Sequence, residues 1–351
     1  MDRRKFLGSS AGLLAAASLG TGYLGTAGRA MAQGRREVTV GGRRVTTIDV
    51  HSHTLIPGTG QLIGTTIPNN NPNLVIGQGR IDAMNRLGID IEILSINPFW
   101  YHLDVDDARR MIEFQNQGLA DLCARYPDRL RAMTTVALQH PELAAEQLEH
   151  GINTLGFVGV SMGGSVAGEE LGSARFDPFW AAAQDLDVPV WLHPQSVPGL
   201  SRLEGNGYLF NVIGNPLDTT IALSHMIFEG VFDRFPRLKI VAAHGGGFLG
   251  SYADRSDYGC ARSPENCPKA IERKPTEYLR DMYFDSLVFT GENLRHLVAQ
   301  YGADHLMIGS DYPYEWTDRP VDHVLETPGL SDADKIAILG GNAMRLFGIE
   351  A

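Results

Sequence analysis

Five polar side chains stand where buried strands of the chain are expected to end. His51 and His53 directly follow the apolar segment 45–50, and residues two apart on an extended chain point the same way. Three more apolar segments each end on one polar residue of this kind: His193, His244 and Asp311. Three neutral imidazoles and one carboxylate, with a position left for water, suit Zn²⁺ or a similar divalent ion. Any one of these histidines alone could be a core or surface residue, so the prediction rests on the whole set.

The elements that must position these residues alternate between buried strands and amphipathic helices. Strands are predicted at residues 45–50, 89–96, 130–136, 155–161, 189–193, 238–244, 283–286 and 305–310. Helices are predicted at residues 80–87, 105–126, 141–150, 178–186, 218–229, 292–301 and 332–347. Strict alternation predicts a parallel sheet, and eight units favour a closed (β/α)₈ TIM barrel over an open doubly wound sheet. This α/β fold places active sites at the C-terminal ends of its strands, where the five polar residues are expected.

The charge of the chain excludes some classes of partner. Its formal net charge is −11, without clusters of Lys and Arg. Nucleic acids and anionic membrane surfaces require a basic face, so neither is expected as a partner. A small-molecule substrate remains, and an anionic one would need local arginine or metal charge to bind against the global field.

The N-terminus resembles a twin-arginine export signal. Arg3 and Arg4 precede a weakly apolar run at residues 8–24, which is too mild for a stable membrane span. Residues 30–32 read Ala-Met-Ala and fit a cleavage site. We therefore expect a signal peptide at residues 1–32, a single barrel domain at residues 33–351, and a periplasmic or secreted location. The alternative is an ordinary disordered tail.

The three cysteines do not suggest a zinc site or a disulfide framework. They are Cys123, Cys260 and Cys267, and no CxxC pair is present. We expect three free thiols. The alternative is a bridge between Cys260 and Cys267 within one loop, which an exported location would permit.

Four motifs together resemble the amidohydrolase superfamily, and in particular its aminocarboxymuconate-semialdehyde decarboxylase family. They are His-Ser-His at 51–53, Leu-His-Pro at 192–194, Ala-His-Gly-Gly-Gly at 243–247 and Gly-Ser-Asp-Tyr-Pro at 309–313. Further matches lie at residues 219–222, 230–236 and 341–343, so the resemblance spans most of residues 46–349. It implies one divalent metal ion, Zn²⁺ by preference or Mn²⁺, bound by these four ligands: His51, His53, His193 and Asp311.

The resemblance also implies catalytic roles for His244 and Asp311. His244 would lie beside the metal-bound water as a general acid or base. This fits the chemistry, because a divalent metal lowers the pKa of bound water toward 7 and a histidine titrates near the working pH. The glycines at 245–247 would let the backbone approach the substrate closely.

In the resembled family, arginines hold the substrate carboxylates, and one of them comes from the neighbouring subunit of a dimer. Arg255, eleven residues after His244, matches that arginine and implies a homodimer, although it could also be an ordinary surface residue. The family's other arginine has no counterpart in residues 54–79, and Arg80, at the start of the next predicted helix, is a candidate replacement. The missing arginine favours a substrate with one acid group, or a neutral one, over a dicarboxylate.

Polar and aromatic residues near the predicted strand ends are candidate substrate contacts. Those we select are Asn97, Trp100, Trp191 and Tyr314. Tyr312 and Trp316 lie nearby in the sequence, and aromatic residues at a barrel mouth fit a flat, conjugated ligand. Packing at the rim or a dimer contact is the alternative. His102 is a further candidate acid or base.

Two enzymatic functions and one binding function fit these residues. We predict non-oxidative decarboxylation of an unsaturated or aromatic carboxylic acid. The alternative is metal-assisted hydrolysis of an ester, lactone, amide or carbon–carbon bond, which uses the same ligands. A third reading is a non-catalytic metal-binding protein, but His244 beside four ligands argues against it, because storage needs no acid or base.

Overall fold

The computed structural model describes residues 34–350, except 65, 66, 68–70, 196, 198, 199, 268–270 and 315. The expected signal peptide at residues 1–32 lies outside the described residues. Among the described residues, no helix has both the length and the apolar character needed to cross a membrane.

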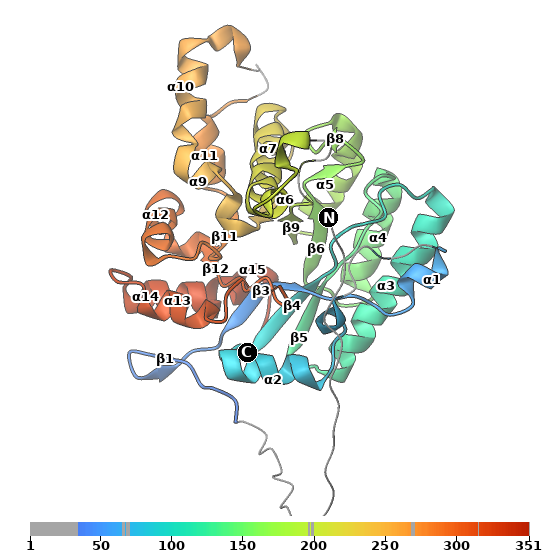
Figure 1. The fold of residues 1–351 in the computed structure, drawn as a ribbon. Coiled ribbons are helices and arrows are strands. Elements are labelled where there is room, and N and C mark those ends of the chain that lie inside the picture. The colour runs from blue at the N-terminus through green and yellow to red at the C-terminus, as the bar shows by residue number, and fades with distance from the viewer. Residues whose placement is uncertain are drawn as a thin grey trace, which may run out of the picture. The chain divides into compact units, whose positions relative to one another are not determined.

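Eight parallel strands form the central sheet (Figure 1). In spatial order they are β3 (Ile48–His53), β4 (Ile91–Ser95), β5 (Leu130–Thr134), β6 (Gly159–Gly163), β9 (Pro189–His193), β10 (Lys239–Ala242), β11 (Tyr283–Asp285) and β12 (Leu306–Met307). Parallel bridges from Asp49 to Ile308 and from Ser52 to Tyr312 connect the first and last strands. The N–H of Val50 also donates to the carbonyl of Ile308 at 3.0 Å. The sheet is thereby closed, which confirms the predicted (β/α)₈ barrel.

Helices follow the strands in the predicted order. The longer ones are α2 (Gln78–Leu87), α3 (Val105–Arg125), α4 (Pro141–Asn153), α5 (Asp177–Asp185), α7 (Gly214–Phe228), α10 (Asp254–Arg262), α12 (Gly291–Tyr301) and α13 (Pro320–Glu326). The shorter ones are α1 (Thr59–Leu62), α6 (Leu209–Val212), α8 (Val231–Arg234), α9 (Leu249–Tyr252), α11 (Pro275–Leu279), α14 (Asp332–Ile336) and α15 (Asn342–Phe347). Helices α10 and α13 were not among the predicted helices. Two hairpins were also not predicted: β1 (Thr39–Val40) with β2 (Arg43–Arg44), and β7 (Ser165–Val166) with β8 (Glu169–Glu170).

The last predicted helix, at residues 332–347, is not a uniform α-helix. A π-helical segment at Ala337–Gly341 separates α14 from α15. Gly340 packs there against the backbone of Thr46, and a Cβ at this position would clash with the Thr46 carbonyl oxygen. The glycine therefore lets the helix lie directly against the start of β3.

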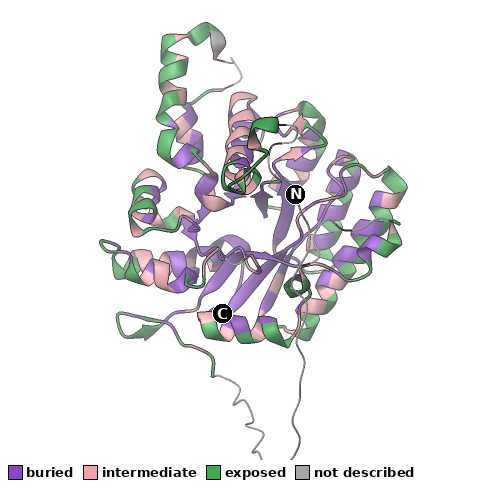
Figure 2. Cartoon of the chain, viewed as in Figure 1, coloured by how far each residue is buried: buried purple, intermediate pink, exposed green. Residues whose placement is uncertain are grey.

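The strands are buried on both faces, as their continuous apolar sequences predict. Figure 2 shows the strands of the eight-stranded sheet mostly in the buried colour, whereas the exposed residues gather on the outer helices, hairpins and loops. One apolar cluster fills the barrel interior and includes Ile48, Ile93, Met133 and Val241, with Phe347 from the C-terminal helix. A larger cluster packs the helices onto the outside of the sheet.

Our expectation of three free thiols is wrong for two of the cysteines. Cys260 at the end of α10 and Cys267 form a disulfide, with their Cα atoms 5.2 Å apart. A short 3₁₀ helix, Pro264–Asn266, lies between these two cysteines, which are seven residues apart in the sequence. Cys123 remains free.

Candidate metal centre

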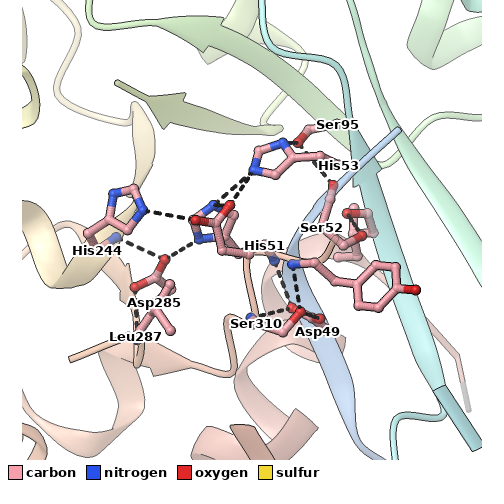
Figure 3. Close-up of polar contacts among 12 residues, drawn as sticks. Asp49, His51, Ser52, His53, Ser95, His244, Asp285, Leu287 and Ser310 are labelled. Carbon is pink, nitrogen blue, oxygen red and sulfur yellow. Dashed lines mark hydrogen bonds and ion pairs between the residues drawn. The ribbon is translucent and has the colours of Figure 1, made fainter. Parts of the chain in front are cut away.

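The predicted metal ligands meet at the C-terminal rim of the barrel. His51 and His53 end β3, where pairing with β4 shifts register between Asp49 and Ser52. His193 ends β9, and Asp311 follows β12. In Figure 3 the imidazole of His51 lies between those of His53 and His244.

Four side chains could share one metal ion. His51, His53, His193 and Asp311 each offer a ligand atom, all four atoms lie within 4.8 Å of one another, and all four residues are buried. Nε2 of His53 lies 2.8 Å from Oδ1 of Asp311, and Nε2 of His51 lies 3.2 Å from the same oxygen. Three imidazoles and a carboxylate match the donor set of a divalent transition metal.

His193 gives the strongest indication that a cation belongs at this point. Both of its ring nitrogens are buried, and neither has a hydrogen-bond partner. A buried polar group without a partner costs about 1–3 kcal/mol, so each such group requires an explanation, and a bound ion is one of them. A metal ion bound by the cluster would satisfy one of these nitrogens, and the donor set therefore fits the implied ion.

The pKa shifts of His53, His193 and Asp311 suit metal binding, which requires neutral imidazoles and an ionised carboxylate. Burial lowers the pKa of His53 to about 4, and burial and the neighbouring histidines lower the pKa of His193 well below its usual value. Burial opposes ionisation of Asp311, but the charge of His51 and hydrogen bonds from the histidines hold the pKa of this carboxyl well below its ordinary value. His51 differs: burial opposes its protonation, but Asp311 and Asp285 raise its pKa to about 10, so it must lose a proton when it binds a metal ion.

Asp285 is part of the site, although the sequence analysis missed it. It ends β11, and its Oδ2 accepts a hydrogen bond from Nδ1 of His51 at 2.6 Å (Figure 3). This bond keeps Nε2 of His51 free to face the metal. The same carboxylate accepts the N–H of His244 at 2.9 Å and that of Gly245 at 3.0 Å. Its position at the end of the seventh predicted strand was the available signal, because each of the recognised residues also follows a strand.

Asp49 holds the two ligand-bearing segments together. Its Oδ1 accepts the N–H of His51 at 3.0 Å and that of Ser310 at 3.1 Å, and the Ser310 hydroxyl donates to its other oxygen. His51 is itself a predicted ligand, and Ser310 directly precedes the predicted ligand Asp311. The carboxylate therefore fixes both strand ends where the barrel closes.

Arg80 does not serve as a substrate arginine. It is 3% exposed, its Nε donates to Glu92 at 2.5 Å and its Nη2 donates to the carbonyl of His53 at 3.2 Å. Its guanidinium also lies over the Tyr312 ring, 4.2 Å from the centroid. These contacts make it a buried support for the first strand, which corrects the suggestion that it could replace the missing arginine.

His244 lies beside the metal cluster on a strained backbone. Its Nε2 is 3.6 Å from Oδ2 of Asp311, and its Nδ1 is buried without a partner. His244 and Asp311 have φ angles of 55° and 59°, a left-handed conformation that is uncommon for residues other than glycine. Such strain gathers at functional sites, where the surrounding structure enforces it. The His244 imidazole and the Asp311 carboxylate could exchange a proton with a molecule bound at the metal.

The glycine run after His244 has a packing role, and its expected role in substrate approach stays a prediction. Gly245 and Gly246 both have positive φ angles. A Cβ at Gly245 would lie 2.7 Å from Val288, and one at Gly246 would lie 2.7 Å from Phe284. These glycines therefore let the loop turn against the neighbouring strand and its following segment.

A cavity of about 970 Å³ opens above the cluster. Its floor includes His53, His193 and Asp311. Most of its wall comes from loops and consists of amide and aromatic side chains: Asn71, Asn73, Asn97, Phe99, Gln195, Tyr208, Phe210, Asn211, Asn215, Tyr314 and Trp316. No lysine or arginine lines it among the described residues. Oδ1 of Asn97 is buried and has no hydrogen-bond partner.

The predicted substrate contacts divide into two groups. Asn97 and Tyr314 line the cavity, whereas Trp100 and Trp191 are fully buried and do not, which corrects their assignment. Nε1 of Trp100 donates to the carbonyl of Val136 at 2.9 Å. Trp191 belongs to the barrel core, with its ring centroid 4.9 Å from that of His51. Trp191 and His193 are two residues apart on one strand, so both side chains point into the barrel, and Trp191 lies one layer deeper.

The two remaining candidates are exposed. His102 does not line the cavity. Arg255 lies on α10, which has no buried residue, and its guanidinium is 5.8 Å from the centre of the Tyr252 ring. Arg255 does not reach the cavity of its own chain. Three further residues line it and were missed: Gln195 after β9, Asn211 on α6 and Asn215 at the start of α7. The irregular sequence of residues 194–216 carries no periodic pattern that could have indicated them.

Comparisons with known proteins agree with this geometry. Residues 48–349 match the model of the amidohydrolase family. The chain is 31% identical to 2-amino-3-carboxymuconate-6-semialdehyde decarboxylase of Dictyostelium discoideum over 274 residues, which cover 77% of this chain and 76% of that protein. It is also 31% identical to gamma-resorcylate decarboxylase of a Polaromonas strain over 289 residues, covering 78% of this chain and 88% of the relative.

Solved structures show the same relationship. The 2,6-dihydroxybenzoate decarboxylase from Rhizobium superimposes with a TM-score of 0.76 at 28% identity, covering 87% of this chain and 99% of that one. The dihydroxybenzoic acid decarboxylase from Polaromonas, solved with bound manganese and 2-nitroresorcinol, has a TM-score of 0.74 at 28% identity, with coverages of 87% and 97%. The closed barrel, the ligand cluster at its rim and a family match over residues 48–349 lead to one conclusion: this chain belongs to the amidohydrolase family.

Proposed function

We propose that this protein is a metal-dependent decarboxylase that removes carbon dioxide, without an oxidant, from an unsaturated or aromatic carboxylic acid. The observation that carries the proposal is the buried cluster of His51, His53, His193 and Asp311 at the floor of a large cavity. The relatives named above are decarboxylases of such acids, and this favours decarboxylation over hydrolysis.

The four ligands would hold the divalent ion, which supplies positive charge for binding the carboxylate and for accepting electron density. Asp285 keeps His51 oriented through the bond from Nδ1. In the reaction the carbon–carboxylate bond breaks, its electron pair stays on the substrate carbon, and a proton joins that carbon as carbon dioxide leaves. His244 and Asp311, 3.6 Å apart, are positioned to hold and deliver this proton.

One assay separates the two enzymatic functions. Metal-loaded protein is incubated with a panel of phenolic acids and a panel of lactones and esters. We expect carbon dioxide release from one or more phenolic acids, without incorporation of water. Acid production from lactones or esters, with no carbon dioxide from any phenolic acid, would contradict the proposal in favour of a hydrolase.

Zn²⁺ is the ion we propose, because three imidazoles and one carboxylate form a common zinc donor set. Mn²⁺ is the alternative, and the manganese in the Polaromonas relative supports it. Elemental analysis of protein purified without added metal identifies the ion. Reconstitution of the metal-free protein with each ion in turn then tests which one restores turnover.

The cavity wall supports a substrate with a single carboxylate. A second carboxylate would need a cationic partner, and the described wall residues include none. The metal would hold the first carboxylate. We therefore expect monocarboxylic acids to be preferred over dicarboxylic acids of the same ring size, unless a neighbouring subunit supplies an arginine.

Arg255 is the residue that such a neighbour would contribute, and we propose a homodimer on this basis. It is exposed on α10, away from the cavity of its own chain, and Tyr252 and Tyr258 beside it are 66% and 72% exposed. Exposed aromatic groups of this size are typical of interfaces. Light scattering gives the mass. Arg255→Ala tests the contact, because it should raise KM without changing metal content.

We also propose export to the periplasm or the medium by the twin-arginine route. The Arg3-Arg4 pair supports it, and so does the Cys260–Cys267 disulfide, since disulfides persist in oxidising compartments. Cell fractionation of the wild type and of a variant with Lys at positions 3 and 4 tests the route. Retention of the wild-type protein in the cytoplasm would contradict it.

A further inference from the structure

Three aromatic side chains from two separate loops meet on the cavity wall, away from the metal ligands. Tyr208 and Phe210 come from the segment after β9, and Trp316 comes from the segment after β12. The rings of Tyr208 and Trp316 are stacked, with centroids 6.2 Å apart and planes inclined by 21°. The Phe210 ring meets the Tyr208 ring edge-on at 4.5 Å. All three line the same cavity as His53, His193 and Asp311.

The packing of the protein itself does not explain this cluster. Tyr208 and Phe210 are 52% and 50% exposed, so the fold leaves about half of each residue uncovered. Tyr208 also has a φ angle of 56°, a left-handed conformation that is unfavourable for a bulky side chain. A strained, half-exposed aromatic residue in a cavity wall is better explained by a ligand that covers it.

The size and charge of the cavity limit what that ligand can be. A volume of about 970 Å³ is at the upper end of the range for pockets that hold drug-sized molecules. A single aromatic ring with one carboxylate would leave much of it empty. The segment that carries Tyr208 also supplies Asn211 and Asn215, so the wall beside the aromatic cluster is polar but uncharged. It suits a neutral planar group with hydrogen-bonding substituents.

We propose that Tyr208, Phe210 and Trp316 form a distal subsite that binds a second planar, uncharged ring or conjugated group of the substrate. This rests on the proposed decarboxylase function, in which the metal centre takes the carboxylate. The substrate class is then a monocarboxylic aromatic acid extended by a neutral planar group. Trp316 is the residue that determines specificity for the distal group, because its ring stacks with Tyr208 and so connects the two segments on the cavity wall.

The test compares two acids that differ only in the distal group. kcat/KM is measured for 2,6-dihydroxybenzoate and for the same acid with a phenyl group at position 4. We expect the wild type to prefer the phenyl-substituted acid by about tenfold, the size of one favourable ring-stacking contact. Trp316→Ala should remove most of this preference. Trp316→Phe, which keeps a planar ring, should retain most of it.

A second variant tests the subsite independently. Tyr208→Asn removes the ring and places at this position a residue that tolerates a positive φ angle, so the loop can keep its conformation. It should also reduce the preference for the phenyl-substituted acid. Phe114→Leu is the matched control, because Phe114 is an exposed aromatic residue on α3 that does not line the cavity. It should leave the preference unchanged.

Binding measurements separate failure of the subsite from failure of the proposed function. Dissociation constants of 2-nitroresorcinol and of its 5-phenyl derivative are measured by calorimetry on metal-loaded protein. A preference for the phenyl derivative that Trp316→Ala removes would support the subsite even if neither acid were decarboxylated. The subsite would be overturned by equal binding of the two compounds, or by an equal loss of both in Trp316→Ala.

Discussion

The floor and the upper wall of the cavity are built in different ways. The floor residues lie at the ends of strands, and their carboxylates are held by several bonds, as Asp285 is by His51, His244 and Gly245. The wall comes mainly from the loops at residues 54–79, 194–216 and 312–318, and it carries amides and half-exposed rings such as Tyr208. Strands position the chemistry rigidly, whereas loops carry the groups that recognise a particular substrate.

The largest expected effect comes from removing the metal at the floor. Chelation, or replacement of Asp311 by Asn, should abolish turnover, because the cluster would lose the charge that holds the carboxylate. Elemental analysis and carbon dioxide release measure the two losses together. Readdition of Zn²⁺ or Mn²⁺ should restore the chelated wild type. Full activity in metal-free protein would show that the floor has another role.

Loss of the acid–base group should have the next largest effect. His244→Asn should lower kcat by about 10²–10⁴, the usual contribution of a positioned proton donor. Its bound metal should remain, because His244 is outside the group of four ligands. Rapid kinetics and metal content measure the two properties. Turnover that survives in a metal-loaded variant would refute the assigned role.

Asp285→Asn tests whether the orientation of His51 matters. We expect metal affinity to fall by about 10–100-fold, because the second partner of a ligating histidine fixes its tautomer and orientation. Competition with a chromogenic chelator measures the affinity. Asp281→Asn is the matched control, since this nearby carboxylate is exposed and pairs with Arg273. Equal affinities in the two variants would show that the bond from His51 is dispensable.

The wall should respond more weakly than the floor. Asn97→Ala should raise KM by about 3–10-fold and leave kcat nearly unchanged, because one neutral hydrogen bond to substrate contributes about 0.5–1.5 kcal/mol. Steady-state kinetics with a phenolic acid separates the two constants. A large fall in kcat would place Asn97 in the chemistry and weaken the distinction between wall and floor.

Trp100 should have the smallest effect on turnover. Trp100→Phe removes its buried bond to the Val136 carbonyl and should lower the free energy of unfolding by about 1–3 kcal/mol. It should leave kcat/KM unchanged, because the residue does not line the cavity. Chemical denaturation and steady-state kinetics measure the two quantities. A rise in KM would contradict this prediction and support Trp100 as a substrate contact.

The barrel and the metal ligands could be predicted because both depend on local patterns. A buried strand is visible in the sequence as a short apolar run. A ligand that directly follows such a run can therefore be placed at the end of that strand. Spacing therefore places five polar residues, His244 among them, at strand ends. The family resemblance selects His51, His53, His193 and Asp311 as the ligands, and the structure brings these four together. Asp285 follows the same rule but was missed, because a single aspartate after a short strand looks unremarkable.

The depth at which a side chain lies within the barrel, by contrast, could not be predicted from the sequence. Trp191 and His193 point the same way from one strand, yet the tryptophan lies in the core and the histidine at the rim. Trp100 and Asn97 belong to one short segment, yet only Asn97 lines the cavity. Period-two alternation fixes the face of a side chain and leaves its height along the barrel axis undetermined.

The sequence by itself determined the alternation of strands and helices, the barrel that follows from it, and the ligand types at its rim, since hydrophobic periodicity and residue chemistry are local properties. Tertiary structure alone decided the Cys260–Cys267 bridge, the bond from His51 to Asp285, and the meeting of Tyr208 with Trp316. Each of these contacts depends on how the chain folds back on itself in space. Packing over the whole barrel decides this path, and no single segment encodes it.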